Sequence, residues 1–451
     1  MLWPRFLWLR GLGLLFLSAF LSLAFQIHGL IGPRGILPAS ELFEALGQPS
    51  LSSLWQVPSL LWLGSSNTAL SLLVSVGLAA SILLTLNVWP RGACAICTVL
   101  FLSFVAAAQD FSSYQSDGML LEAGFLSLFF APGGLRPGLG ELDPPSRLAR
   151  FLLLWEWFRI YFESGIVKLA SGDEQWRTLT ALDHYYENGP LPTYLGWYAQ
   201  QIPPHAFHAA CCVVVFLFEF VLNYLVLFLA VLLLDDPFLA RVGLRPPAEV
   251  PRPARSKAGV ILQGAVLGFV FAATLVEAPL VPRVLPRPLL WPAIALAPFR
   301  IANGYGLFAV MTKERFEIEF QGSRDGKTWT PYPFRFKPQD PAAAPGIYAP
   351  YQPRFDWNLW FASLGTFREY PWVVQTEALL LDGEPSVLRL FAFDPFHGKP
   401  PAQVRTVLWQ YWFTTRAEKR ATGRWWRREL RGPYAPGLRK GSGGRLEIID
   451  R

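Results

Sequence analysis

The chain has 451 residues, of which 52% are hydrophobic and only 16% are charged. It contains 18 Trp and 35 Phe residues, and its mean hydropathy is positive, at +0.29. This composition excludes an ordinary soluble enzyme and indicates a membrane protein that crosses the bilayer several times. The formal net charge is +7, but many basic residues lie in short loops between apolar runs. Their distribution argues against a nucleic-acid partner and indicates a membrane topology in contact with lipid.

Apolar runs predict about seven membrane spans. The first follows a basic N-terminus and is about 20 residues long, and because no clean cleavage site follows, we expect a retained span and not a signal peptide. The run at 117–131 is short and follows a polar stretch, so a re-entrant segment is the alternative there. The predicted spans are 11–30, 67–89, 93–109, 117–131, 148–170, 206–234 and 258–281.

Lys and Arg residues are distributed unequally between alternate loops. One set of loops holds most of them, including the basic run between 241 and 257, whereas the other set has only Arg34 and Arg177 beyond Lys168 at a helix end. The positive-inside rule therefore places the N-terminus in the cytoplasm and the chain after about residue 282 outside. We expect a multi-pass protein of the endoplasmic reticulum membrane in a eukaryote. In a bacterium we expect the inner membrane, with a periplasmic C-terminal domain.

The chain is predicted to divide into three parts. Residues 1–281 form the transmembrane helical bundle, residues 282–311 form an interfacial linker interrupted by Pro and Gly, and residues 312–451 form a soluble domain. The expected fold class is thus a polytopic α-helical membrane protein with a C-terminal, mostly β extramembrane domain.

Alternation of polar and apolar residues predicts the strands of the C-terminal domain. Asp325-Gly326 is a turn dipeptide, so the first two strands should form a hairpin. The tail at 415–431 combines Arg with paired Trp, which is typical of an interfacial helix. The predicted strands are 315–320, 332–336, 386–393 and 404–413.

The predicted span at 148–170 contains Glu156, Arg159, Glu163 and Lys168. An ionised side chain at membrane depth costs roughly 2.5 to 3.5 kcal/mol, so such residues normally face a bundle interior and pair. Glu156, Arg159 and Glu163 lie on one helix face at 100° per residue, which predicts an internal ion cluster that fixes helix packing. Lys168 lies off that face near the outer end, where it either reaches the interface or belongs to a functional site.

Asp117 and Glu122 lie in the predicted segment at 117–131, on the same outer side as Lys168. They diverge by about 140° on a helix, so they are not expected to act as a paired acid and base. We assign Asp117 to the structural ion cluster, with a helix cap as its expected role. Glu122 is expected to be buried and paired with Arg159 or Lys168, and a functional site remains the alternative.

Cysteine and histidine spacings suggest two further candidate sites. Cys94 and Cys97 have the spacing of a redox pair, but we interpret them as small core residues of a helix. His205 and His208 are one turn apart, and we interpret them as interfacial polar residues, so no metal site is predicted. The chain has no HExxH, no Gly-rich phosphate loop and no GxSxG, so neither hydrolysis nor nucleotide binding is predicted, and no cofactor is expected.

Several long stretches resemble the lipase maturation factor family. They include DGMLLEAGFLSLFFAP at 117–132, FRIYFESGIVKLASGDEQW at 158–176 and YAPYQPRFDWNLWFASLG at 348–365, in the family's order. The resemblance implies a polytopic membrane protein whose eukaryotic members help secreted homodimeric lipases to reach an active fold. It also implies that the C-terminal region faces the lumen, with client proteins, lipases among them, as partners.

A second resemblance covers one motif. The segment SGIVKLASGDEQW at 164–176 is similar to the Gly-x-x-Lys-Leu stretch of the vitamin-K-dependent γ-carboxylase-like membrane family. It implies a membrane enzyme with Lys168 as the base on a reduced quinone and Glu122 in the same site. The sequence therefore leaves two functions open, a maturation factor and this enzyme.

Aromatic residues are dense in the C-terminal domain between 348 and 361. On the maturation-factor hypothesis we expect them to form a surface that contacts client proteins. The alternative is that they form the core of the domain. The candidate client-binding residues are Tyr348, Tyr351, Phe355, Trp357 and Trp360.

Overall fold

A computed structural model describes residues 2–112, 114–222, 240–241, 243, 256–279, 281–283, 285–441 and 443–449. Within these ranges four helices are long and apolar enough to cross a membrane. They are α1 (Leu2–Ile31), α4 (Asn67–Thr85), α5 (Pro90–Ala107) and α14 (Lys257–Glu277). A pair of helices bent by 114°, Tyr194–Gln201 and His205–Phe220, is a possible fifth span. The chain is therefore an integral membrane protein, but the prediction of seven spans is not confirmed.

Length and charge explain the difference in the span count. Helix α6 (Gln115–Leu128) has 14 residues, fewer than the roughly 20 that a span requires. Helix α7 (Arg147–Ala170) has 24 residues, but it carries the charged residues of the predicted ion cluster. The second half of the predicted span at 206–234 lies outside the described residues.

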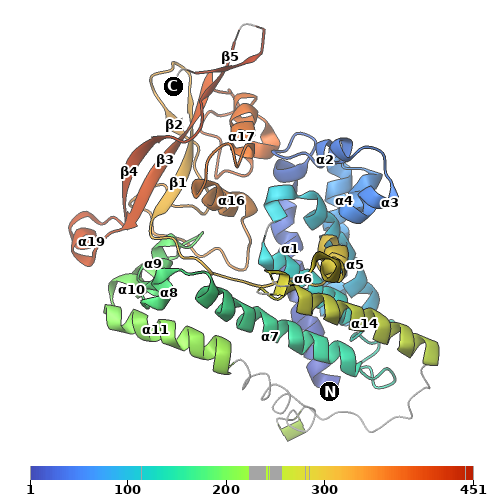
Figure 1. The fold of residues 1–451 in the computed structure, drawn as a ribbon. Coiled ribbons are helices and arrows are strands. Elements are labelled where there is room, and N and C mark those ends of the chain that lie inside the picture. The colour runs from blue at the N-terminus through green and yellow to red at the C-terminus, as the bar shows by residue number, and fades with distance from the viewer. Residues whose placement is uncertain are drawn as a thin grey trace.

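Helices α1, α4, α5 and α6 pack side by side into an upright bundle (Figure 1). Its core is aromatic, since the Phe101 ring lies 6.1 Å from the Phe16 ring and 5.9 Å from the Phe20 ring. At the N-terminal end of α1, Arg5 donates hydrogen bonds to the carbonyls of Leu139 and Gly140 at 2.7 and 2.8 Å. The outer loops of the bundle form α2 (Ala39–Leu46), α3 (Leu51–Gln56), η1 (Leu60–Leu63) and η2 (Gln109–Ser112).

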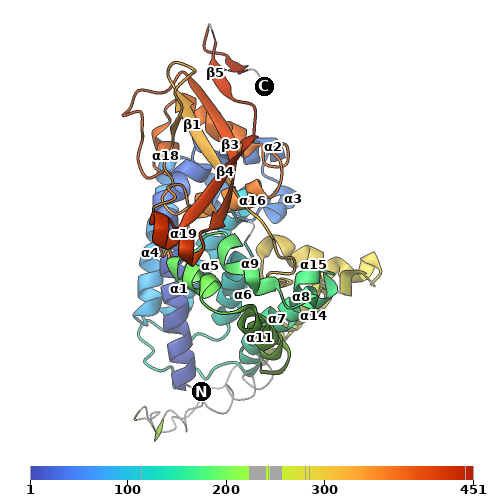
Figure 2. The same cartoon turned by 90° about the vertical axis from the view of Figure 1, so that its left-hand side faces the viewer.

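A second group of helices runs across the axis of this bundle. Figures 1 and 2 show α7, α11 and α14 crossing its side, below the C-terminal domain. Helix α7 packs against α6 and α14, and Trp155 Nε1 donates to Thr274 Oγ1 at 3.0 Å. The segment after α7 forms α8 (Glu174–Arg177), α9 (Ala181–Asn188), α10 (Tyr194–Gln201), α11 (His205–Leu217) and the π-helical turn η3 (Phe218–Leu222).

Short helical turns connect α14 to the C-terminal domain. Pro residues at 282, 286, 288, 292 and 298 keep each turn short, because Pro has no amide hydrogen and ends a helix. None of these turns is long enough to cross a membrane. They are η4 (Val281–Arg283), η5 (Arg287–Leu290), α15 (Trp291–Leu296) and η6 (Ala297–Phe299).

The C-terminal domain is built on one antiparallel sheet. Its strands are β1 (Arg315–Ser323), β2 (Thr330–Pro331), β3 (Gln403–Phe413), β4 (Trp426–Pro433), β5 (Leu438–Lys440) and β6 (Leu446–Ile448). The order is β2-β1-β3-β5-β6, and β4 pairs with the other half of β3. Two helices, α16 (Arg354–Ser363) and α17 (Trp372–Leu381), lie between the sheet and the bundle (Figure 1), and α18 (Pro385–Leu388) packs against α1 and α17. The domain is therefore less purely β than predicted.

Strand predictions are confirmed at 315–320 and 404–413, and β1 pairs with β2 as a hairpin. The prediction at 386–393 is wrong, because Glu384 accepts a hydrogen bond from the Ser386 amide and Pro385 occupies the first turn of α18. The prediction at 332–336 is wrong as well, since pairing ends at Pro331. Pro333 has no amide hydrogen with which to continue the ladder.

The tail at 415–431 is not a single interfacial helix. A short helix, α19 (Arg416–Thr422), ends at Gly423, which adopts a positive φ of 72°. Strand β4 then begins at Trp426, whose side chain is buried with its ring 4.4 Å from that of Phe413. This Trp belongs to the core of the domain and not to a membrane surface.

Candidate functional site

The charged residues of α6 and α7 meet a segment that neither helix contains. Residues 300–311 run along α7 without regular helix or strand, and the small residues of this segment allow a close approach. A Cβ atom on Gly304 would lie 2.7 Å from the carbonyl oxygen of Glu277, and one on Gly306 would lie 3.3 Å from the Val167 side chain. We call residues 300–311 the strap.

Glu122 is the centre of the first buried network. One carboxylate oxygen accepts from Arg159 Nη2, and the other accepts from the Tyr305 hydroxyl at 2.9 Å and from Asn303 Nδ2 at 3.0 Å. Arg159 Nη1 also donates to the Asn303 carbonyl. Glu122 and Arg159 are each 1% exposed. The network therefore holds α6, α7 and the strap together through one buried charge pair, Glu122 and Arg159.

The other predicted members of the ion cluster take separate partners. Glu163 accepts from the backbone amide of Tyr305 at 2.7 Å, and Glu156 is buried at 4% exposure. The hydrogen-bond partners of Arg159 thus come from α6 and the strap, not from the acids on its own helix face. A long Arg side chain at a helix crossing reaches the facing helix as easily as its own neighbours.

Lys168 lies deeper than an interfacial anchor. Its ammonium donates to Glu219 at 2.6 Å and to the carbonyls of Ser164 at 3.2 Å and Leu307 at 3.0 Å. It also lies 5.3 Å from the Trp176 ring centroid. A Lys ammonium has three hydrogens, so these three acceptors use all of them. Glu219, on η3, was not identified from the sequence.

Asp117 does not cap a helix. It lies within the first turn of α6 and forms a bidentate pair with Arg354 of α16, at 2.7 and 2.8 Å. Arg354 also donates to the Phe111 carbonyl at 2.9 Å, and its guanidinium lies 4.9 Å from the Phe104 ring centroid. Such a two-bond fork fixes orientation as well as distance. This pair joins the bundle to the C-terminal domain.

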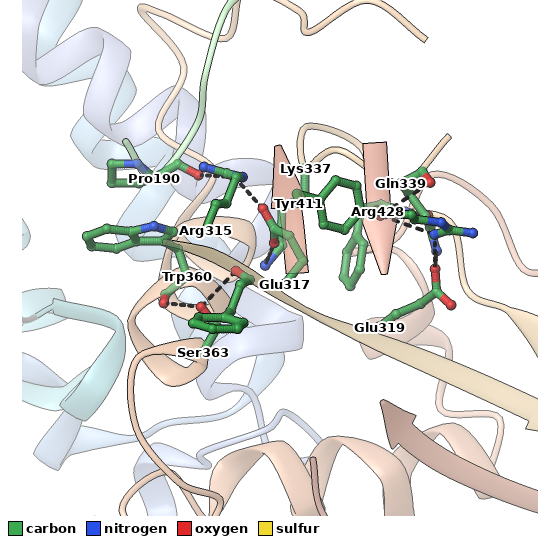
Figure 3. Close-up of polar contacts among 12 residues, drawn as sticks. Pro190, Arg315, Glu317, Glu319, Lys337, Gln339, Trp360, Ser363, Tyr411 and Arg428 are labelled. Carbon is green, nitrogen blue, oxygen red and sulfur yellow. Dashed lines mark hydrogen bonds and ion pairs between the residues drawn. The ribbon is translucent and has the colours of Figure 1, made fainter. Parts of the chain in front are cut away.

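A second charge network lies within the C-terminal domain where it meets the outer helices. Figure 3 shows Arg315 directed at Glu317 and at the Pro190 carbonyl, which lies 3.2 Å from Nη2. Lys337 Nζ lies 2.5 Å from the other oxygen of Glu317. Burial raises the pKa of the neighbouring Asp356 to about 7, an effect that the Lys337 charge opposes. Strand β1 is thereby connected to the loop after α9.

The same figure shows Arg428 of β4 directed at Glu319 of β1 (Figure 3). Its Nη1 atom lies 3.1 Å from Glu319 and 3.1 Å from the Tyr411 hydroxyl. Gln339 Nε2 donates to the same carboxylate at 3.1 Å. These contacts join three strands and the loop that follows β2. The Glu319 carboxylate is thus occupied by hydrogen bonds within the sheet.

The aromatic residues between 348 and 360 divide into two groups. Phe355 is 1% exposed and lies in the core, with its ring 5.2 Å from that of Phe391. Tyr348, Tyr351, Trp357 and Trp360 are half-buried. The Tyr348 and Trp357 rings meet edge to face at 6.1 Å. These four keep one part of each ring open to the surroundings.

Cys94 and Cys97 occupy packing positions, whereas His205 is exposed. Cys94 and Cys97 are free and fully buried, and Cys94 Sγ lies 3.4 Å from the Gly124 carbonyl. His205 contacts Asp183 at 2.9 Å. Among the described residues, no three His, Cys, Asp or Glu side chains converge as ligands for a metal ion.

Similarity to known proteins covers both parts of the molecule. Residues 3–240 match the lipase maturation factor transmembrane domain, and residues 301–436 match the lipase maturation factor C-terminal domain. The chain belongs to the lipase maturation factor family. The buried networks lie where the two matched regions meet. Glu122 and Arg159 belong to the transmembrane region, whereas Asn303 and Arg354 belong to the C-terminal region.

Three vertebrate proteins show how far the similarity extends. Lipase maturation factor 2 of Gallus gallus is 32% identical, over 94% of this chain and 80% of that protein. Lipase maturation factor 1 of Bos taurus is 30% identical, over 96% and 88% of the two chains. Lipase maturation factor 2 of Homo sapiens is 28% identical, over 97% and 83%. No solved structure matches the chain.

Proposed function

We propose that this protein is a maturation factor in the membrane that helps exported proteins, lipases among them, to reach their active fold. The observation that carries the proposal is the similarity of nearly the whole chain to proteins named lipase maturation factor 1 and 2. In a eukaryote the membrane would be that of the endoplasmic reticulum, and in a bacterium the inner membrane. The C-terminal domain lies at the end of the bundle opposite the N-terminus (Figure 1), so a cytoplasmic N-terminus would put this domain on the side to which clients are exported.

The way in which the C-terminal domain is held supports this role. The Asp117–Arg354 pair joins it to α6, and α1 holds the Pro-rich loop 337–353 because Ser18 Oγ and Gln26 Nε2 donate to Pro350 and Gln352 at 2.7 and 2.9 Å. A surface held in place in this way offers a client a preorganised partner, which lowers the entropy lost on binding.

The client surface that we propose lies on this loop. Ile347 is 59% exposed, and Tyr348 beside it is half-buried. Tyr351 packs its ring 5.3 Å from Phe336, and Trp357 supports Tyr348 from α16. Exposed apolar and aromatic side chains on a restrained loop suit an incompletely folded client, whose own apolar groups are still exposed. Phe355, being in the core, is left out of this surface.

The test is co-expression with a secreted homodimeric lipase in cells that lack their own maturation factor. We expect the specific activity of the secreted lipase to rise with this protein. We expect it to fall severalfold with the double substitution Ile347→Ser and Tyr348→Ser, because the apolar contact is lost. Leu446→Ser is the matched control, since Leu446 is 51% exposed on β6, elsewhere in the domain. Equal lipase activity with and without the protein would contradict the proposal.

The enzyme alternative gains no support from the geometry of Lys168. A base needs a neutral amine with access to substrate, whereas Lys168 is 3% exposed and donates to a carboxylate and two carbonyls. The contacts favour a packing role for Lys168, in which it holds α7 to η3 and to the strap.

A further inference from the structure

A cavity of about 560 Å³ lies where the linker meets the bundle. It is lined by the ends of α5 and α14, by α3 and by the residues from Ala297 to Gly304. Its volume falls within the roughly 300 to 1,000 Å³ that is typical of sites for small ligands. None of the Glu122 and Lys168 contacts described above fills it. Asn303, at its edge, turns its side chain away to Glu122.

The cavity carries two opposite charges that are not paired with each other. Glu277 ends α14 and Arg300 follows η6, and both line the cavity. Within the described residues, neither side chain lies within ion-pair distance of an opposite charge or forms a side-chain hydrogen bond, and the Arg159 charge acts on Glu277 only from farther away. Gln56 and Gln109 add amide groups to the same wall. Since a half-buried charge is costly without a partner, this arrangement calls for a ligand that carries both signs.

The membrane position of the cavity restricts the ligand further. It opens at the ends of two candidate spans, because α5 stops at Ala107 and α14 at Glu277. Trp55 of α3 is 49% exposed, and its ring lies 4.8 Å from that of Phe299, beside the Pro298 that lines the cavity. Exposed Trp residues at the ends of spans are typical of the headgroup region of a bilayer.

We propose that this cavity binds the headgroup of a zwitterionic phospholipid with a primary amine, of the phosphoethanolamine type. The phosphate pairs with the Arg300 guanidinium, which presents several N–H donors to phosphate oxygens. The ammonium donates to the Glu277 carboxylate and to the Gln amide oxygens. The acyl chains leave the cavity along the apolar side of α14, where Leu275 is 44% exposed. A choline headgroup has no N–H to donate to the carboxylate and is disfavoured.

The experiment measures lipid binding to the purified, delipidated full chain by native mass spectrometry. The probes are phosphatidylethanolamine, phosphatidylcholine and phosphatidylglycerol of one chain composition, together with water-soluble phosphoethanolamine. We expect phosphatidylethanolamine to bind at least tenfold more tightly than the other two lipids. We also expect it to bind more tightly than the soluble headgroup, which lacks the acyl chains.

Two substitutions separate the two charges. Arg300→Gln should weaken binding of all three phospholipids at least tenfold, and Glu277→Gln should remove the preference for phosphatidylethanolamine over phosphatidylcholine. The matched controls are Arg177→Gln and Glu44→Gln, which change exposed residues outside the cavity and should leave binding unchanged. Arg300→Lys, which keeps the charge, is the second variant should Arg300→Gln not purify as a monodisperse protein.

Three results would overturn the proposal. The first is equal affinity of the unaltered chain for the three lipids. The second is variants at 277 and 300 that bind as the two controls do. The third is soluble phosphoethanolamine binding as tightly as the lipid, which would assign the site to a free metabolite and not to the bilayer.

Discussion

Individual buried charges in this protein are enclosed by specific acceptors. Arg159, Arg315 and Arg354 are each no more than 1% exposed, and each donates to a carboxylate and to at least one backbone carbonyl. Removing one partner from such a pair commonly costs 3 to 5 kcal/mol, because a buried charge is left without compensation. The main effect of these contacts is therefore to fix which elements pack together, and their net contribution to the free energy of unfolding is small.

Glu377 on α17 is a buried acid of a different kind. It is 0% exposed and accepts from Thr406 Oγ1 at 2.7 Å, but within the described residues its other oxygen has no hydrogen-bond partner. Burial raises its pKa to about 8. The folded protein thus holds a proton there that the unfolded chain releases at about pH 4.3.

The sign of the pH effect follows from that raised pKa. The folded state binds the extra proton, so stability is fully present at acid pH and falls by about 1.4 kcal/mol per pH unit between about pH 4.5 and 8. Glu377→Gln, which stays neutral, should flatten this slope and raise the unfolding temperature most at pH 8. Thermal unfolding in detergent across this range measures it, and parallel curves for the two proteins would contradict the assignment.

At the scale of elements, close helix approach depends on residues without a side chain. A Cβ atom on Gly77 of α4 would lie 2.4 Å from the ring of Phe20 on α1, a residue that is itself fully buried. In a membrane bundle small residues let helices pack tightly, since the surrounding lipid provides little hydrophobic drive for association. The close approach of α1 and α4 at this point thus depends on Gly77 facing the Phe20 ring.

Gly77→Ala should therefore lower the unfolding temperature, because the ring must move or the helices must separate. Overpacking of this kind typically costs 1 to 3 kcal/mol. Gly264→Ala on α14 is the matched control, since nothing lies within 4 Å of its added Cβ. That substitution should be neutral or stabilise the helix by up to about 1 kcal/mol. Equal losses for both variants would show that the ring contact is not responsible.

At the scale of the molecule, buried charge contacts join the transmembrane region to the C-terminal region. The Asp117–Arg354 pair and the network of Glu122 with the strap both join residues that are far apart in the sequence. The helices α16 to α18 lie at this junction (Figure 1). The orientation of the C-terminal domain relative to the bundle follows from contacts that bury charge, which tolerate little displacement.

Arg354→Gln should loosen this junction. The loss of the two-bond contact leaves Asp117 buried without its partner, so the linker before β1 should become more accessible to protease. Limited proteolysis in detergent, followed on a gel as release of the C-terminal fragment, measures the effect, and we expect cleavage at least tenfold faster.

Arg439→Gln serves as the control for that variant, because its ion pair with Glu447 is exposed, at 51% and 43%. Exposed pairs contribute between 0 and about 1 kcal/mol, so its cleavage rate should match that of the unaltered protein. If Arg354→Gln is also cut at the unaltered rate, the pair does not hold the junction.

Local patterns were enough to predict the membrane class, the helices α1, α4, α5 and α14, and the strands β1 and β3, whereas the family followed from the resemblance of long stretches. Hydrophobicity, alternation and turn residues act over neighbouring positions, so they can be recognised in a single chain. They failed at 386–393, where a Pro and a helix cap outweighed the alternation, and at Trp426, where strand pairing with β3 buried a residue that resembled an interfacial anchor.

Local sequence patterns could not predict which charged residues pair with each other. Helix periodicity put Glu156, Arg159 and Glu163 on one face, yet Arg159 bonds to Glu122 and the strap, Asp117 to Arg354, and Lys168 to Glu219. Each of these partners lies at least 37 residues away along the chain. The energy of a charge pair depends on distance and burial in space, and both arise only when distant helices pack together.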